Sequence, residues 1–126
     1  MNYRKDKYGN DISILGFGCM RFPRTVGLTN MKETEAEILE AIKGGINYFD
    51  TAWFYHGGNS EIVMGKVLSK YPRESYYLAD KYPGHQIASR YDPASLFEKQ
   101  LEKCGVEYFD YYLLHNLGKE NYARCL

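Results

Sequence analysis

The sequence predicts an α/β protein built from repeated strand–helix steps. Four apolar segments of strand length end at Cys19, Asp50, Lys81 and His115, which lie 31, 31 and 34 residues apart. That spacing is typical of βαβ units and predicts a parallel sheet with right-handed crossovers. Two architectures accept four such steps. One is the N-terminal half of a (β/α)8 TIM barrel, a fold of about 250 residues, and the other is a small doubly wound parallel sheet.

The first step runs from a strand through a loop into a capped helix. The apolar run at 12–19 predicts the strand. Thr34 and Glu37 have the spacing of a capping box, in which a threonine hydroxyl accepts from a free amide and a glutamate reaches back. We therefore expect the helix to begin at Thr34. The two glycines at 44–45 are typical of a helix end.

The later steps repeat this pattern. Asp92 followed by Pro93 is a strong helix start, because an aspartate caps free amides and proline fits the first helical position. The predicted strands cover 46–50, 76–81 and 108–114, and the predicted helices run from Asn59 or Ser60 to Tyr71, from Asp92 to Gly105, and onward from near Lys119.

Composition excludes several classes of protein. The chain has 126 residues, with 16 Lys+Arg and 16 Asp+Glu, so its zero formal charge predicts binding neither to nucleic acid nor to an anionic membrane. No apolar run reaches the about 18 residues of a membrane-spanning helix, and the first residues do not resemble a signal peptide. The three cysteines form no CxxC pair, which argues against a disulfide framework and predicts a cytoplasmic protein.

Polar residues stand at the ends of three consecutive predicted strands. Asp50, Lys81 and His115 each follow an apolar run. Ligands bind at the carboxyl ends of parallel strands, and neighbouring strands lie about 4.8 Å apart, so these side chains can converge. Asp50 and Lys81 can form an ion pair there, whose role is either catalytic or limited to seating the strands.

Tyr55 lies on the loop that follows Asp50, above the same strand ends. A tyrosine hydroxyl is a weak proton donor near neutral pH, and a nearby ammonium such as that of Lys81 would strengthen it. The alternative is a packing aromatic, since the chain has 13 tyrosines. A neutral imidazole at His115 could donate a hydrogen bond to a substrate carbonyl, and the alternative is a histidine whose hydrogen bonds are satisfied within the protein at the strand end. His56 and His85 lie in predicted loops, and we assign them no role.

Met20 and Arg21 follow the first strand and therefore also belong to this end of the sheet. Arg21 could approach an anionic group of a cofactor or substrate, and the alternative is an arginine that only faces solvent. The glycines at 16–18 do not begin a dinucleotide fingerprint, because the third glycine of GxGxxG would fall at Arg21. The spacing of cysteines and histidines fits no metal site.

Segments along the whole chain, in the right order, resemble the aldo-keto reductase family. The run Phe-Asp-Thr-Ala-Trp-Phe-Tyr at 49–55, followed by Gly-Asn-Ser-Glu at 58–61 and by Gly65, resembles the family signature, and residues 16–21 resemble the family at its first strand. The resemblance implies a (β/α)8 barrel that binds NADPH, or less often NADH, and reduces aldehydes and ketones to alcohols.

The resemblance also implies a role for each polar residue at the strand ends. Tyr55 matches the general acid, Lys81 the residue that makes it a better proton donor, and Asp50 the partner of Lys81. His115 matches the residue that orients the carbonyl by donating a hydrogen bond to its oxygen. The expected partner is a small-molecule carbonyl compound, and no metal is implied. The positions beside the cofactor are Met20, Arg21 and Asp50.

The residue before Lys81 departs from the family pattern. Asp80 stands where a threonine is common. Its carboxylate would add negative charge near Lys81 if both side chains faced the same way. Successive side chains of a strand face opposite sides, so an outward position for Asp80 fits equally.

The family barrel is more than twice as long as this chain, so we read 1–126 as a single partial domain, the N-terminal half of such a barrel. Half a barrel leaves two sheet edges open to self-association, and we expect little turnover from it alone. Residues 81–84, with Asn116 and Leu117, resemble the branch that carries a C-terminal iron–sulfur segment, which implies a [4Fe-4S] cluster further along. The four catalytic positions favour an enzyme over a non-catalytic relative that serves as a binding or regulatory module.

Overall fold

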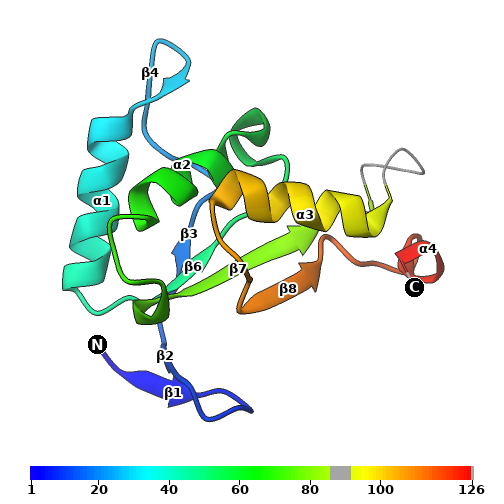
Figure 1. The fold of residues 1–126 in the computed structure, drawn as a ribbon, viewed down its shortest axis with the longest axis horizontal. Helices are drawn as coiled ribbons and strands as arrows, with labels where there is room; N and C mark the ends of the chain where they lie inside the picture. The colour runs from blue at the N-terminus through cyan, green and yellow to red at the C-terminus, as the bar shows by residue number, and fades with distance from the viewer. Residues whose placement is uncertain (86–91, 126) are drawn as a thin grey trace.

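The fold is given by a computed structural model, which describes residues 1–85 and 92–125. Its centre is a parallel sheet in which each strand lies beside the next one along the chain. Helices α1, α2 and α3 form one layer over this sheet (Figure 1). A doubly wound sheet would reverse its strand order and carry helices on both faces, so the structure excludes that alternative. The strands, in order, are β3 (Phe17–Gly18), β6 (Tyr48–Asp50), β7 (Tyr77–Tyr82) and β8 (Tyr111–Leu114).

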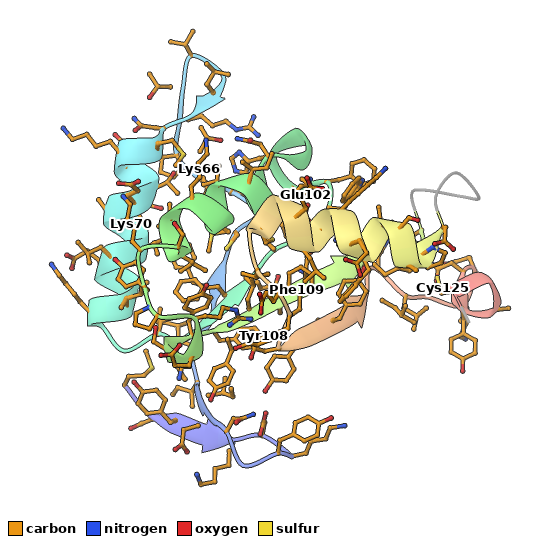
Figure 2. All side chains as sticks on the ribbon, viewed as in Figure 1. Lys66, Lys70, Glu102, Tyr108, Phe109 and Cys125 are labelled. Carbon is orange, nitrogen blue, oxygen red and sulfur yellow. The ribbon has the colours of Figure 1, made fainter. Side chains whose placement is uncertain are left out.

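One hydrophobic core joins the helices to the sheet. Phe49 of β6 and Leu78 of β7 are almost completely buried, and they share the core with Ile38 of α1, Met64 of α2 and Cys104 of α3. Side chains fill the space between the two layers, whereas the labelled charged residues of α2 and α3 stand on the outer side (Figure 2). The helical segments are α1 (Met31–Lys43), η1 (Tyr55–Gly58), α2 (Ser60–Leu68), η2 (Arg73–Ser75), α3 (Pro93–Cys104) and α4 (Tyr122–Cys125).

The start of α1 differs from the prediction. The helix begins at Met31, three residues before Thr34, and Asn30 is its cap, with Oδ1 accepting from the Glu33 amide at 3.1 Å. Thr34 is buried in the first turn, where its hydroxyl donates to the Asn30 carbonyl at 2.8 Å. The capping-box interpretation is therefore wrong, because an asparagine, which is at least as good a cap, precedes the threonine.

The other helix boundaries are closer to the prediction. The helix α3 has Asp92 as its cap, with Oδ2 accepting from the Ser95 amide at 3.0 Å, and it ends at Gly105 in the left-handed conformation at φ 64°. The helix α2 begins at Ser60 as predicted but ends at Leu68, three residues before the predicted end at Tyr71, and the separate 3-10 turn η2 begins at Arg73. The strands β6 and β7 lie within two residues of the predicted ranges.

The predicted first strand at 12–19 is wrong in part. Only β3 joins the sheet, whereas β2 (Asp11–Ser13) pairs antiparallel with β1 (Tyr3–Lys5) in a hairpin. This hairpin crosses the N-terminal ends of the parallel strands, where the Ser13 amide donates to Asn47 Oδ1 at 2.9 Å. A second hairpin, β4 (Arg24–Thr25) with β5 (Leu28–Thr29), occupies the predicted loop. Alternating apolar residues indicate a strand but not its partner, which explains the first of these differences.

The fourth strand is shorter and more exposed than predicted. β8 covers only four residues and is an edge strand of the sheet. Tyr112, Leu113 and Leu114 are 38%, 43% and 37% exposed, although they belong to the most apolar predicted strand. In a closed barrel such residues would pack against further strands. None of the helices in the described ranges is long and apolar enough to cross a membrane.

Gly65 sets the approach of α2 to α3. A Cβ atom at this position would lie 2.6 Å from the carbonyl oxygen of Cys104. We expect Gly65→Ala to lower the free energy of unfolding by about 1–3 kcal/mol, because the two backbones must separate. Gly18→Ala is the control, since its Cβ would meet nothing within 4 Å. Equilibrium unfolding in denaturant measures both, and equal stabilities would contradict the role of Gly65.

Candidate active site

Asp50 and Lys81 meet at the carboxyl ends of neighbouring strands. In the register of β6 and β7, Asp50 lies opposite Ala79, so Lys81 reaches back over the end of β6. Its Nζ donates to Asp50 Oδ2 at 2.6 Å and to the Thr51 carbonyl at 2.7 Å. The Lys81 side chain is 12% exposed, and the Asp50 side chain is 31% exposed. The pair is therefore fixed and largely shielded from water.

Tyr55 opens the 3-10 turn η1 directly above this pair. The Lys81 ammonium lies 4.9 Å from the centre of the Tyr55 ring, in a cation–π arrangement. The ring meets that of His115 edge to face, with 5.7 Å between centres. The Tyr55 hydroxyl makes no hydrogen bond with any described residue. It is therefore available to a ligand.

His115 follows β8 and completes the group. Its backbone amide donates to the Tyr82 carbonyl at 2.9 Å, which ties it to the end of β7. Burial, together with the nearby charge of Lys81, lowers the pKa of His115 below its ordinary value of 6.5. The imidazole is therefore neutral at neutral pH, and it can donate one hydrogen bond without carrying a charge. The unfolded chain binds a proton at this histidine more readily than the folded chain does. The free energy of unfolding therefore falls as the pH drops from 6.5 through the lowered pKa.

The influence of Lys81 on His115 can be measured. We expect Lys81→Met to raise the pKa of His115, because a positive charge that disfavours the imidazolium is removed. NMR titration of the ring resonances follows this directly. Lys70→Met is the control, since Lys70 forms an exposed ion pair with Glu35 and should leave the His115 titration unchanged. An identical titration in all three proteins would contradict the proximity of the two groups.

The structure places one residue in the site that the sequence interpretation left without a role. The His85 ring centre lies 4.7 Å from that of His115, on the loop that leaves β7 four residues after Lys81. Its position only four residues after Lys81 is the feature of the sequence that could have identified it as part of the site. His56, also unassigned, has a structural place instead, since its Nε2 accepts from the Phe22 amide at 2.6 Å.

A pocket of about 350 Å³ opens at these strand ends. Met20 belongs to it and is 53% exposed, whereas Arg21 is exposed but does not line it. In the part of the chain that the structure describes, no three His, Cys, Asp or Glu side chains gather as a metal site would require. The lining residues are Met20, Phe54, Tyr55, His85, His115 and Asn116.

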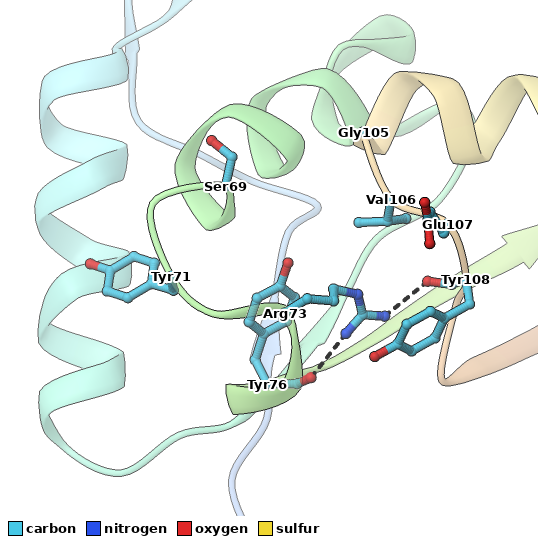
Figure 3. A pocket seen from close by; sticks show the side chains of 8 residues that line it. All are labelled: Ser69, Tyr71, Arg73, Tyr76, Gly105, Val106, Glu107 and Tyr108. Atoms are coloured by element: carbon cyan, nitrogen blue, oxygen red, sulfur yellow. Dashed lines mark hydrogen bonds between the residues drawn. The ribbon is translucent and has the colours of Figure 1, made fainter.

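A second hollow, of about 320 Å³, lies at the opposite end of the sheet, beside the segments that precede β7 and β8. Figure 3 shows the residues that line it. Its prominent cation, Arg73, is already engaged, since Nη1 donates to the Tyr76 carbonyl at 3.1 Å and Nη2 to the Tyr108 carbonyl at 2.9 Å. Asp110 pairs with the same guanidinium at 2.8 Å. Arg73 therefore holds η2 to the segment before β8, and we assign this hollow no catalytic role.

The parallel sheet with its helices is consistent with part of a (β/α) barrel, and Tyr55, His85 and His115 line a pocket at the carboxyl ends of its strands, where barrel enzymes place their active sites. The model of the aldo/keto reductase family matches residues 14–124. The chain therefore belongs to the aldo/keto reductase family.

Individual relatives agree with this assignment. The probable aldo-keto reductase 1 of Glycine max is 35% identical over 124 residues, which cover 86% of this chain and 34% of that protein. The NADH-specific methylglyoxal reductase of Escherichia coli is 35% identical over 95 residues, 62% of this chain and 29% of that protein. The chain thus spans about a third of the length of these curated relatives.

Solved structures share the fold. The holo form of an aldo-keto reductase from Bacillus halodurans has a TM-score of 0.77 at 28% identity, covering 98% of this chain and 43% of that one. An aldo-keto reductase from Klebsiella pneumoniae in complex with NADPH has the same TM-score at 22% identity, covering 94% of this chain and 40% of that one. The chain therefore spans less than half the length of these solved structures and shares their fold over that part.

Proposed function

We propose that residues 1–126 carry the catalytic half of a nicotinamide-dependent carbonyl reductase. The observation that supports it most strongly is the convergence of Asp50, Tyr55, Lys81 and His115 at one end of the sheet, where Tyr55 and His115 line a pocket and the Asp50–Lys81 pair lies against the Tyr55 ring. A hydroxyl that makes no hydrogen bond with a described residue, an ammonium and a neutral imidazole are groups suited to protonation of a carbonyl oxygen.

Each residue has a distinct part in this reaction. A bound nicotinamide supplies the hydride that reduces the carbonyl carbon. Tyr55 donates its hydroxyl proton to the carbonyl oxygen, and the Lys81 ammonium stabilises the tyrosinate that remains. Asp50 holds that ammonium through the 2.6 Å contact. His115 donates a hydrogen bond to the same oxygen and so fixes the orientation of the carbonyl.

The pocket fits part of such a cofactor. Its volume of about 350 Å³ is at the low end of the range for ligand pockets, about 300–1,000 Å³. That is room for a ring-sized group and a small carbonyl compound, not for a whole dinucleotide. We propose that Met20, which lines the pocket, and Asp50 border the nicotinamide, and that exposed Arg21 reaches an anionic part of the cofactor.

The similar proteins include one that is associated with NADPH and one that is associated with NADH, so we propose either as the cofactor. One similar structure is a complex with NADPH, and one similar protein is an NADH-specific methylglyoxal reductase. We propose that the preference is decided by residues beyond the half of the barrel present here. The substrate is proposed only as a small aldehyde or ketone, in a pocket partly lined by His85 and Phe54.

Further proposals concern the behaviour of the 126-residue chain by itself. We propose that the 126-residue chain turns over little by itself, because half of a barrel supplies only part of the cofactor site. Its exposed β8 edge offers a route to self-association, which gel filtration would detect. The iron–sulfur segment and the cytoplasmic location remain predictions from the sequence.

Binding of the cofactor is the simplest test of this function. We define the completed barrel as residues 1–126 joined to the C-terminal half of the Bacillus halodurans relative. Fluorescence titration should show NADPH or NADH binding to the completed barrel, and equal binding by its Tyr55→Phe variant, because the hydroxyl is assigned to proton transfer. A folded completed barrel that binds neither cofactor would contradict the proposal.

A further inference from the structure

The outer face of β7, opposite to the site, carries an unusual group of buried polar side chains. Asp80 faces away from Lys81, toward α2 and α3, so the outward alternative of the sequence interpretation holds. Asp80, Glu61 of α2 and Gln100 of α3 are all 0% exposed. Buried polar groups of this kind are costly unless each has a partner, so their arrangement calls for a physical reason.

The reason lies in the backbone of Lys81. The Tyr82 carbonyl accepts from His115 on the β8 side, and the Ala79 carbonyl accepts from Thr51 on the β6 side. Because backbone groups alternate along a strand, Lys81 faces the β6 side, where β6 has already ended at Asp50. Its amide and its carbonyl therefore have no strand to pair with, and an unpaired buried backbone group is unfavourable.

Side chains take the place of the missing strand. Asp80 Oδ1 accepts from the Lys81 amide at 2.8 Å. Gln100 Nε2 donates to the Lys81 carbonyl at 2.9 Å and also to Glu61 Oε1 at 2.9 Å. The Tyr112 hydroxyl donates to Gln100 Oε1, so the amide of Gln100 is fully used.

This group holds two carboxyl groups, of Glu61 and Asp80, and one ammonium, of Lys103, so its charges cancel only if one carboxyl group carries a proton. Glu61 Oε2 lies 2.7 Å from Lys103 Nζ, which neutralises one carboxylate. Asp80 Oδ2 is buried and has no donor among the described residues. A second buried carboxylate without a partner would be strongly unfavourable. A proton on Asp80 removes the charge and turns the orphaned oxygen into a donor.

We propose that Asp80 carries a proton which it donates to Glu61, and that this pair, together with Gln100, is the positioning element for the backbone of Lys81. The positioning of Lys81 stands on the hydrogen bonds above. Its importance for catalysis rests on the proposed function.

The electrostatic surroundings support this assignment. Burial, reinforced by the adjacent Glu61, raises the pKa of Asp80 to about 9. Burial also raises the pKa values of Cys19, Cys104 and Tyr112, so these groups keep their protons in the same range. The titratable side chains around Asp80 are Glu61 from α2, Lys103 and Cys104 from α3, Tyr112 from β8, Lys81 from β7 and Cys19 after β3.

The proton can be observed without any substrate. The ¹³C resonance of the Asp80 carboxyl in the wild-type protein should titrate near pH 9, far above the ordinary value of 3.8. The folded state then holds a proton that the unfolded chain lacks, so stability falls as the pH rises from about 4 to about 9. In Asp80→Asn the folding equilibrium constant should decrease less steeply over this pH range, the difference from the wild type being up to about tenfold per pH unit. Asp11→Asn, at an exposed ion pair, is the control.

The positioning role has its own readout. Hydrogen exchange at the Lys81 amide should be about tenfold faster in Asp80→Ala than in Asp80→Asn, because asparagine keeps an oxygen that accepts from this amide. Titration of the Asp80 carboxyl near 4 would overturn the proton assignment, and equal exchange in the two variants would overturn the positioning. Neither measurement depends on cofactor or turnover, so the result stands apart from the proposed function.

Discussion

Tyr55→Phe is expected to remove aldehyde reduction by the completed barrel while leaving its fold and its cofactor binding intact. The hydroxyl is the proposed proton donor, and loss of a positioned general acid lowers the rate by about 10²–10⁴-fold. The fold should be unaffected, because the hydroxyl makes no hydrogen bond with a described residue and the ring contacts to Lys81 and His115 remain. The measurement is kcat/KM for a simple aldehyde, beside unfolding in denaturant.

The matched control for this variant is Tyr71→Phe. Tyr71 is a half-buried tyrosine that lines the hollow at the opposite end of the sheet. Its variant should reduce the aldehyde at the wild-type rate. Undiminished activity in Tyr55→Phe would show that another group donates the proton.

Lys81→Met should have a comparable effect on turnover and an additional effect on stability. The ammonium stands between Asp50, at 2.6 Å, and the Tyr55 ring, at 4.9 Å from its centre. Without it, the tyrosinate formed by proton transfer loses its nearest cation, and we expect kcat to fall by about 10²-fold or more. Asp50 is left as a partly buried carboxylate without its partner, which destabilises the fold.

This second prediction separates a catalytic ion pair from one that only seats the strands. A seating pair would show lower stability in Lys81→Met with kcat unchanged in the folded protein. Lys70→Met, which breaks an exposed pair, should change neither quantity measurably. Turnover at a temperature well below the unfolding transition, together with the transition itself, distinguishes these outcomes.

The positions of the site residues were predictable because of how parallel strands end. Asp50, Lys81 and His115 each terminate an apolar run, and in a parallel sheet such termini share one edge. The cap at Asp92 and the stop at Gly105 were equally local signals, and the structure confirms both. A local signal failed where two candidate caps stand close together, since Asn30 and not Thr34 caps α1.

Features that depend on distant partners could not be predicted. The β1–β2 hairpin owes its position to Asn47, a residue 34 positions away from Ser13. The role of His85 depends on where the loop after β7 turns, and the orientation of Asp80 depends on α2 and α3 closing over it. Each of these is a tertiary contact that hydrophobic periodicity does not encode.

The exposure of β8 has the same origin. Leu113 and Leu114 are apolar, yet they lie on an edge strand and are 43% and 37% exposed. Apolar composition predicted the strand correctly but could not tell how much of it would be buried.

The central claim is that this half of the barrel carries the residues that protonate a carbonyl oxygen. The most direct measurement is aldehyde-dependent oxidation of NADPH or NADH by the completed barrel, with wild-type and Tyr55→Phe versions of residues 1–126 in parallel. We predict steady oxidation in the wild type and loss of about 10²–10⁴-fold in the variant, with the cofactor bound in both. A folded, cofactor-binding wild type that reduces no aldehyde, or a variant that is equally active, would contradict the claim.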